Sequence, residues 1–97
     1  MAAYAIFIRE STRDRSELDV YTPKAAASMA GRRMKVLAAY GPQEMLEGPG
    51  MEGVVIVEFP SMEEARAWYD SPAYREAREH RFRGAEYRAF IVEGLEE

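Results

Sequence analysis

The chain has 97 residues, of which 47% are hydrophobic and 31% are charged, and its formal net charge is −4. This length fits a single domain, residues 1–97, and leaves no room for a second hydrophobic core. The negative charge argues against a general affinity for nucleic acid, because phosphate binding needs a positive surface. The absence of cysteine excludes disulfides, thiolate nucleophiles and cysteine-ligated metal sites.

The beginning of the chain predicts a soluble protein. Residues 1–8 contain no basic segment and no long apolar run, so no signal peptide is expected. No apolar stretch approaches the roughly 20 residues that span a bilayer. We therefore expect a cytoplasmic protein with no membrane partner.

The first strand is expected at residues 4–8, which are β-rich and apolar on both faces, as in a central strand. Residues 9–13 are expected to turn out of it. Residues 14–17 have the spacing of a capping box, with Asp14 as the N-cap.

A helix is expected to follow, because apolar side chains recur at helical intervals. They are Leu18, Tyr21, Ala25 and Met29. Pro23 is expected to kink or restart this helix, with Thr22 as a fresh N-cap. Gly31 is expected to close it.

Two further strands are predicted around the clearest turn of the chain, residues 48–50. Residues 34–46 are expected to form an irregular edge strand, with Gly41 and Pro42 at a bulge or an edge position. Residues 54–59 form the strongest strand pattern, again apolar on both faces.

The second helical segment is expected in two pieces. Residues 61–64 have capping-box spacing, and Ala65, Trp68 and Tyr69 would line the buried side. Ser71 and Pro72 would restart the helix, as N-cap and first-turn residue. Gly84 would end it, and residues 87–92 would form the last strand.

The order β-α-β-β-α-β predicts an α+β, ferredoxin-like domain: a four-stranded antiparallel sheet with the helices on one face. The first and third strands would occupy its centre. Along residues 54–59 both faces of the strand carry apolar side chains, and no remaining element can cover the second face. An exposed apolar face of this kind predicts a homodimer, in which the open sheet faces meet.

The sequence also resembles the family called domain of unknown function 1330. The resemblance is carried by residues 54–61 (VVIVEFPS) and 65–74 (ARAWYDSPAY), and continues through residues 84–94. It implies a dimeric α+β barrel, a superfamily that includes small monooxygenases, muconolactone isomerases and haem-handling proteins. It implies no particular activity.

Two segments depart from the family's pattern. The family often carries Gly-Gly-Arg entering the second strand and Arg-Gly-Gly later in it. Here these regions read Gly31-Arg32-Arg33-Met34 and Ala39-Tyr40-Gly41. If the missing arginine contacts a ligand in relatives, Tyr40 is the group that would replace it.

The candidate catalytic residues are His80 and Arg81, which fall near the face of the last helix that packs on the sheet. In a functional role, Arg81 would bind an anionic or carbonyl oxygen through its fork of donors, and His80 would act as acid, base or haem ligand. In a structural role, Arg81 would pair with a glutamate and His80 would cap a carbonyl.

The candidate ligand-binding residues are aromatic: Tyr21, Tyr40, Trp68 and Tyr69. Tyr21, Trp68 and Tyr69 are also well suited to a structural place in the core or at its rim. One histidine, no cysteine and dispersed carboxylates predict no metal site, and no cofactor motif is recognisable.

Two functions follow from different classes of protein. The chain could bind or convert a small organic molecule between helices and sheet, as a cofactor-free monooxygenase- or isomerase-like protein. The alternative is a non-catalytic homodimeric binding or stress-associated module on the same scaffold. A closed pocket of about 300 Å³ or more, with Arg81 and a tyrosine pointing inward, would favour the first. A filled core, with His80 and Arg81 facing water or ion-paired, would favour the second.

Overall fold

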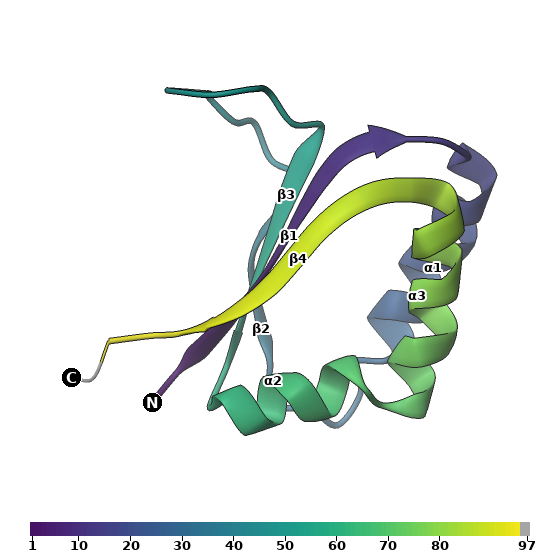
Figure 1. Cartoon of the computed structure of the whole chain (residues 1–97). Coiled ribbons are helices and arrows are strands. Elements are labelled where there is room, and N and C mark those ends of the chain that lie inside the picture. Colours follow the sequence, from purple (N-terminus) through teal and green to yellow (C-terminus); the bar gives the residue numbers. More distant parts are fainter. Residues whose placement is uncertain (96–97) are drawn as a thin grey trace.

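A computed structural model describes residues 1–95 of the chain and shows seven elements. These are β1 (Ala3–Thr12), α1 (Arg15–Ala27), β2 (Lys35–Ala39), β3 (Gly53–Phe59), α2 (Met62–Tyr69), α3 (Pro72–Gly84) and β4 (Ala85–Glu93). The strands form one antiparallel sheet in the order β2-β3-β1-β4. The helices lie on one side of it, with α1 and α3 next to each other (Figure 1). The expected ferredoxin-like fold, with β1 and β3 in the centre, is confirmed.

The register of β1 decides which side chains face the helices. Ala3, Ala5 and Phe7 are buried beneath them, and their partners on β3 are Phe59, Val57 and Val55. The intervening residues of β1 point to the opposite face. This strict alternation places one apolar set in the core and leaves a second apolar set on the open face of the sheet.

The core between sheet and helices is largely aromatic. The Trp68 and Tyr74 rings lie 4.0 Å apart between centroids, and the Trp68 ring lies 5.6 Å from that of Phe59. The edge of Phe7 meets both Trp68 and Tyr74, at 6.1 and 6.4 Å. These contacts join α2 and α3 to the two central strands.

The break between α2 and α3 follows the sequence prediction. Ser61 caps α2 by accepting a hydrogen bond from the Glu64 amide at 3.1 Å, and Ser71 caps α3 by accepting one from the Tyr74 amide at 3.3 Å. Pro72 occupies the first turn of α3, where its missing N–H leaves no helical bond unmade.

The expected restart of α1 at Pro23 was wrong, because Pro23 lies inside one continuous helix. The Thr22 hydroxyl does not cap a new helix and instead donates to the Leu18 carbonyl at 3.0 Å. Asp14 is the N-cap, as expected, but it accepts from the Ser16 amide. Glu17 does not complete a capping box, because its carboxylate contacts α3 instead.

Two strand boundaries also differ from the prediction. β1 does not turn at residue 9 but continues to Thr12, with a bulge between Arg9 and Ser11, because this segment pairs with the start of β4. β2 is an edge strand as expected, yet it ends at Ala39, and its irregularity lies between Val36 and Ala38. It stops there because Tyr40 has a positive φ of 58°, which breaks the extended backbone.

The Trp68 indole has a buried hydrogen bond that generates a test of this core. Its Nε1 donates to the Ser28 hydroxyl at 3.0 Å, and that hydroxyl donates to the Ala25 carbonyl at 2.6 Å. Ser28→Ala leaves the indole N–H buried without an acceptor and is expected to lower the free energy of unfolding by about 1–3 kcal/mol.

Urea denaturation measures this change, with Ser11→Ala on the exposed part of β1 as the control. The control is expected to stay within about 0.5 kcal/mol of the parent protein, as surface substitutions do. A Ser28→Ala loss no larger than that of Ser11→Ala would contradict a structural role for the indole bond.

Candidate functional site

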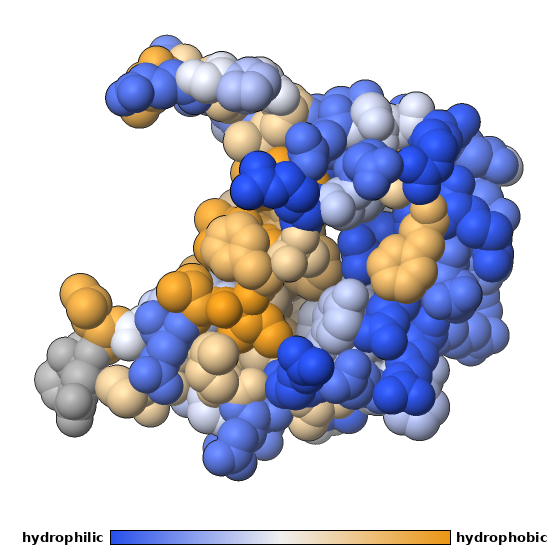
Figure 2. All heavy atoms as spheres, in the orientation of Figure 1, coloured by the Kyte–Doolittle hydropathy of each residue, from blue (hydrophilic) through white to orange (hydrophobic). Residues whose placement is uncertain are grey.

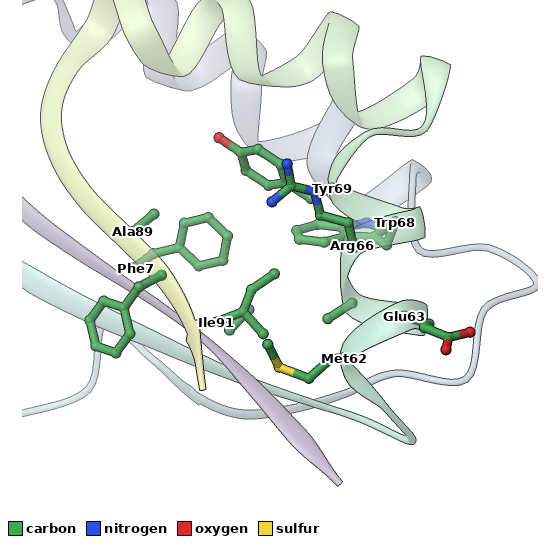
Figure 3. A pocket seen from close by; sticks show the side chains of 11 residues that line it. Phe7, Met62, Glu63, Arg66, Trp68, Tyr69, Ala89 and Ile91 are labelled. Atoms are coloured by element: carbon green, nitrogen blue, oxygen red, sulfur yellow. The ribbon is translucent and has the colours of Figure 1, made fainter. Parts of the chain in front are cut away.

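A pocket of about 570 Å³ lies between α2 and the β1–β4 side of the sheet. Its walls are mostly apolar. Figure 3 shows Met62, Arg66 and Tyr69 of α2 on one side, and side chains of β1 and β4 on the other. The carboxylate of Glu63 points away from the hollow (Figure 3). The space is large enough for a small organic ligand.

The floor of the pocket is made by two successive cross-strand pairs. Ala5 lies opposite Ile91, and Phe7 lies opposite Ala89, on the side of the sheet that faces the helices. Ala89 faces this side yet is exposed, because no helix covers β4 there. The pocket exists because a small side chain stands where a large one would fill the layer.

Two predicted ligand-binding residues lie in this wall. Trp68 and Tyr69 both line the pocket, and their rings are 6.5 Å apart between centroids. Trp68 is only 4% exposed, so only a small part of its ring surface is available to a ligand in the pocket. Tyr69 is less buried, and the Arg78 guanidinium stacks on its ring at 4.3 Å from the centroid.

Arg81 lies beyond the inner end of the pocket and is only 3% exposed. Its Cζ is 5.3 Å from the centroid of the Phe7 ring, 5.0 Å from that of Tyr87 and 5.1 Å from that of Phe82. Its Nε makes no hydrogen bond within residues 1–95. The guanidinium is therefore a buried cation enclosed by aromatic rings.

The glutamate partner that a structural role predicts for Arg81 is not found in the part of the chain that the structure describes. Two other arginines of α3 are compensated: Arg78 lies 3.5 Å from the Asp70 carboxylate, and Arg83 lies 3.0 Å from that of Glu17. Among residues 1–95, no carboxylate forms an ion pair with Arg81. Burial of a cation without an anionic partner is unfavourable by itself.

Tyr21, another predicted ligand-binding residue, lies near Arg81 but is hydrogen-bonded within the protein. Its hydroxyl is 2.8 Å from that of Tyr74. Burial, with a smaller effect from the other hydroxyl, raises the pKa of Tyr21 well above its ordinary value, and burial also raises the pKa of Tyr74. Both phenols therefore stay neutral at physiological pH and do not neutralise Arg81.

Tyr40 reaches the same layer from the end of β2. Its hydroxyl lies 2.5 Å from that of Tyr87, and Arg9 stacks over its ring at 4.8 Å. Burial of the ring raises the pKa of Tyr40. Gly53 makes this position possible, because a Cβ there would lie 2.4 Å from a carbon of the Tyr40 ring.

His80 lies apart from the pocket, at the contact between α1 and α3. Its Nδ1 is 2.7 Å from one Glu17 oxygen, and the Nε of Arg83 is 3.0 Å from the other. His80 does not face Arg81 or the pocket, so the structure does not bring the two predicted catalytic residues together. These contacts are closer to the structural role considered for His80, in which it would cap a carbonyl, except that the partner is the Glu17 carboxylate.

The sequence reasoning missed several residues that build the site. Met62, Ala89 and Ile91 line the pocket, and Tyr74 and Tyr87 enclose Arg81. A usable signal was Ala89, a small residue at a helix-facing strand position between Tyr87 and Ile91. Within residues 1–95, no group of three or more acidic or imidazole side chains is arranged to hold a metal ion.

The cluster around Glu17 generates a prediction of pH dependence. Hydrogen bonding to His80 first, and to Arg83 second, holds the pKa of Glu17 below its ordinary value of 4.5. A lowered pKa in the folded state means that the ionised carboxylate stabilises the fold above the unfolded value, and that this contribution is lost as the pH falls further.

We therefore expect the stability of the parent protein relative to Glu17→Gln to shrink as the pH falls from about 5 to below about 4.5. Urea denaturation across this range measures it. Glu79→Gln, which removes an exposed carboxylate from α3, serves as the control and is expected to show a smaller change. A pH-independent difference for Glu17→Gln would contradict the ionised contact.

Comparison with solved structures gives the same architecture at low sequence identity. The RPA0582 protein of unknown function from Rhodopseudomonas palustris superposes with a TM-score of 0.77 and 19% identity, covering 99% of this chain and 84% of that protein. A dimeric protein of unknown function with a ferredoxin-like fold from Bacteroides fragilis has a TM-score of 0.63 and 16% identity, covering 96% of each chain.

SnoaB, a cofactor-independent oxygenase from Streptomyces nogalater, is also similar in fold, with a TM-score of 0.61 and 7% identity over 99% of this chain and 95% of that one. At such identities the likeness concerns the fold alone. The search of curated proteins gave no significant match. The model of one family, Domain of unknown function (DUF1330), matches residues 2–95, and the chain belongs to that family.

Proposed function

We propose that this protein binds a small, largely apolar organic molecule in the pocket between α2 and β4. The observation that carries the proposal is the pocket itself: about 570 Å³, lined mainly by apolar side chains of three elements, β1, α2 and β4. An apolar hollow of this size is larger than the voids that packed cores leave, and this supports a ligand-binding role.

Conversion of the ligand is the further step of this proposal. SnoaB, with a similar fold, is a cofactor-independent oxygenase, and a putative antibiotic biosynthesis monooxygenase from Caulobacter crescentus is another fold neighbour. These neighbours support a cofactor-free oxygenase- or isomerase-like reaction by analogy of scaffold. Here His80 lies outside the pocket and Glu63 points away from it, so binding has the stronger support.

Ala89 offers a way to test the pocket without disturbing the core. Ala89→Phe fills the floor, and it is expected to abolish the thermal stabilisation that small neutral aromatics, such as 2-naphthol and benzyl alcohol, give the parent protein. Ala67→Phe is the matched control, because Ala67 is an exposed residue of α2 outside the pocket lining. Two outcomes would contradict the pocket as the binding site. In one, the aromatics stabilise Ala89→Phe and Ala67→Phe equally; in the other, they stabilise neither variant and not the parent protein.

The protein is further proposed to act as a homodimer. The sheet face opposite the helices carries an apolar set along three strands: Tyr4, Ile6, Ile8, Val54, Ile56, Phe90 and Val92. Figure 2 shows apolar side chains gathered over the strands, in a hollow beside the projecting loop between β2 and β3. Phe90 and Val92 are 47% and 45% exposed, an unfavourable state for a lone chain in water.

A second copy of the chain is the occupant we propose for this face. The related structures from Bacteroides fragilis and Thermobifida fusca are dimeric proteins of ferredoxin-like fold. A two-fold arrangement would let the same apolar patch cover itself. Within residues 1–95, no helix is both long and apolar enough to cross a membrane.

Substitution on the open face tests the dimer. Val92→Asp places a charge where the two sheets would meet, and it is expected to convert a dimer into a monomer in sedimentation at micromolar concentration. Val20→Asp is the matched control, because Val20 is similarly exposed, at 40%, but lies on α1. A folded parent protein that sediments as a monomer at high concentration would refute the dimer.

A further inference from the structure

The most unusual polar group of the molecule is the buried guanidinium of Arg81. Its surroundings are the rings of Phe7, Phe82 and Tyr87 and the neutral hydroxyls of Tyr21 and Tyr74, of which Tyr74 hydrogen-bonds to the guanidinium while Nε stays without a partner. Stacking on aromatic rings stabilises a cation only modestly, whereas a carboxylate or another anion would satisfy both its charge and its N–H groups. Within residues 1–95 the protein supplies no such anion.

The register of β1 and β4 connects Arg81 to the pocket. Three successive pairs face the helices: Ala5 with Ile91, Phe7 with Ala89, and Arg9 with Tyr87. The first two pairs form the floor of the pocket, and Tyr87 of the third pair lies under the Arg81 guanidinium. Arg81 itself does not line the pocket; the Phe7 ring, which does, lies 5.3 Å from its Cζ and separates the two.

Other cations near the pocket are already compensated. Arg66 lines the mouth of the pocket, but its Nε lies 3.0 Å from the Asp70 carboxylate and its side chain is 73% exposed. Arg9 lies 3.1 Å from Glu52. Arg81 is thus the one buried arginine within residues 1–95 that has a free charge and lies near the pocket.

From these contacts we infer that the ligand of the pocket is a monocarboxylate with an apolar body, and that Arg81 binds its carboxylate. This inference rests on the proposed function. A planar guanidinium accepts a carboxylate in a bidentate pair, through two parallel N–H···O bonds. The apolar body would occupy the space between Met62, Ala89 and Ile91, which offers no strong hydrogen-bond donor. The Phe7 ring has to rotate for the two ends to be filled together.

The test compares acids with their isosteric amides. Benzoate, phenylacetate and cinnamate, each with its primary amide, are titrated calorimetrically into the intact protein. We expect at least one acid to bind about tenfold or more tightly than its amide, because a charged hydrogen-bonded pair is stronger than a neutral one. Trp68, the single tryptophan and a pocket residue, gives a second readout through its fluorescence.

Variants then assign the preference to one arginine. Arg81→Met is expected to weaken the acid about tenfold to a hundredfold and to leave the amide unchanged. Arg81→Lys keeps the charge without the fork and is expected to retain part of the preference. Arg66→Met removes the cation at the pocket mouth and serves as the matched control, with the preference expected to stay.

A purely structural arginine would behave differently. Without ligand, Arg81→Met is expected to be at least as resistant to heat as the parent protein, because it removes an uncompensated buried charge. If instead Arg81→Met unfolds, the comparison of acid with amide in the parent protein, Arg66→Met and Arg81→Lys still decides whether Arg81 binds the carboxylate.

The outcomes separate this inference from the proposed function. Equal affinities for acids and amides in the parent protein would overturn the carboxylate while leaving a binding pocket in place. A preference lost in Arg66→Met and kept in Arg81→Met would overturn the role of Arg81. If no acid and no amide binds, and Ala89→Phe changes nothing with the neutral aromatics either, the proposed function itself falls.

Discussion

The arrangement of this protein depends on the packing of Trp68 against Tyr74. These rings come from different helices, and their 4.0 Å separation fixes α2 and α3 relative to each other and to Phe7 on β1. The backbone break at Ser71 and Pro72 allows both rings to point into the same layer. After this contact α3 runs away from α2 (Figure 1), so that α2 alone stands over the Ala89 side of β4. With the small Ala89 side chain beneath it, this leaves the pocket open.

The two sides of the sheet serve separate purposes in the proposed function. Alternation along β1 and β3 directs one apolar set toward the helices and the other toward the open face. The helix-facing set builds the pocket floor, and the open set is available for a second chain. Ligand binding and assembly therefore use different residues of the same strands. Phe90 is the exception, since it belongs to the open face and also lines the pocket.

The sequence predicted the fold well, because its main signals are local and physical. The serine caps at Ser61 and Ser71, followed by Pro72, marked the helix starts, and the two-sided apolar patterns marked the central strands. Pro23 misled the prediction of a restart, since a proline in the third turn of α1 forfeits one bond without ending the helix. The end of β2 could not be foreseen, because Tyr40 takes a positive φ that depends on its contact with Gly53 and Tyr87.

The candidate site was less accessible from the sequence. Helical spacing placed Arg81 correctly on the buried face of α3, but the same spacing could not show that Glu17 pairs with His80 and Arg83 rather than with Arg81. Which carboxylate reaches which cation depends on how α1 lies against α3. The pocket floor could not be predicted either, because it depends on the register of β1 with β4. Ala89 indicates a pocket only once Phe7 is known to lie opposite it.

The contact of Tyr40 with Gly53 has a consequence for how this protein can vary. The ring lies where any larger residue at 53 would place its first side-chain carbon, so residue 53 cannot gain a side chain while Tyr40 keeps this position. Gly53 places no such limit on residue 40. An aromatic ring in this place therefore requires glycine at the start of the third strand, whereas glycine there also accommodates a smaller residue at 40.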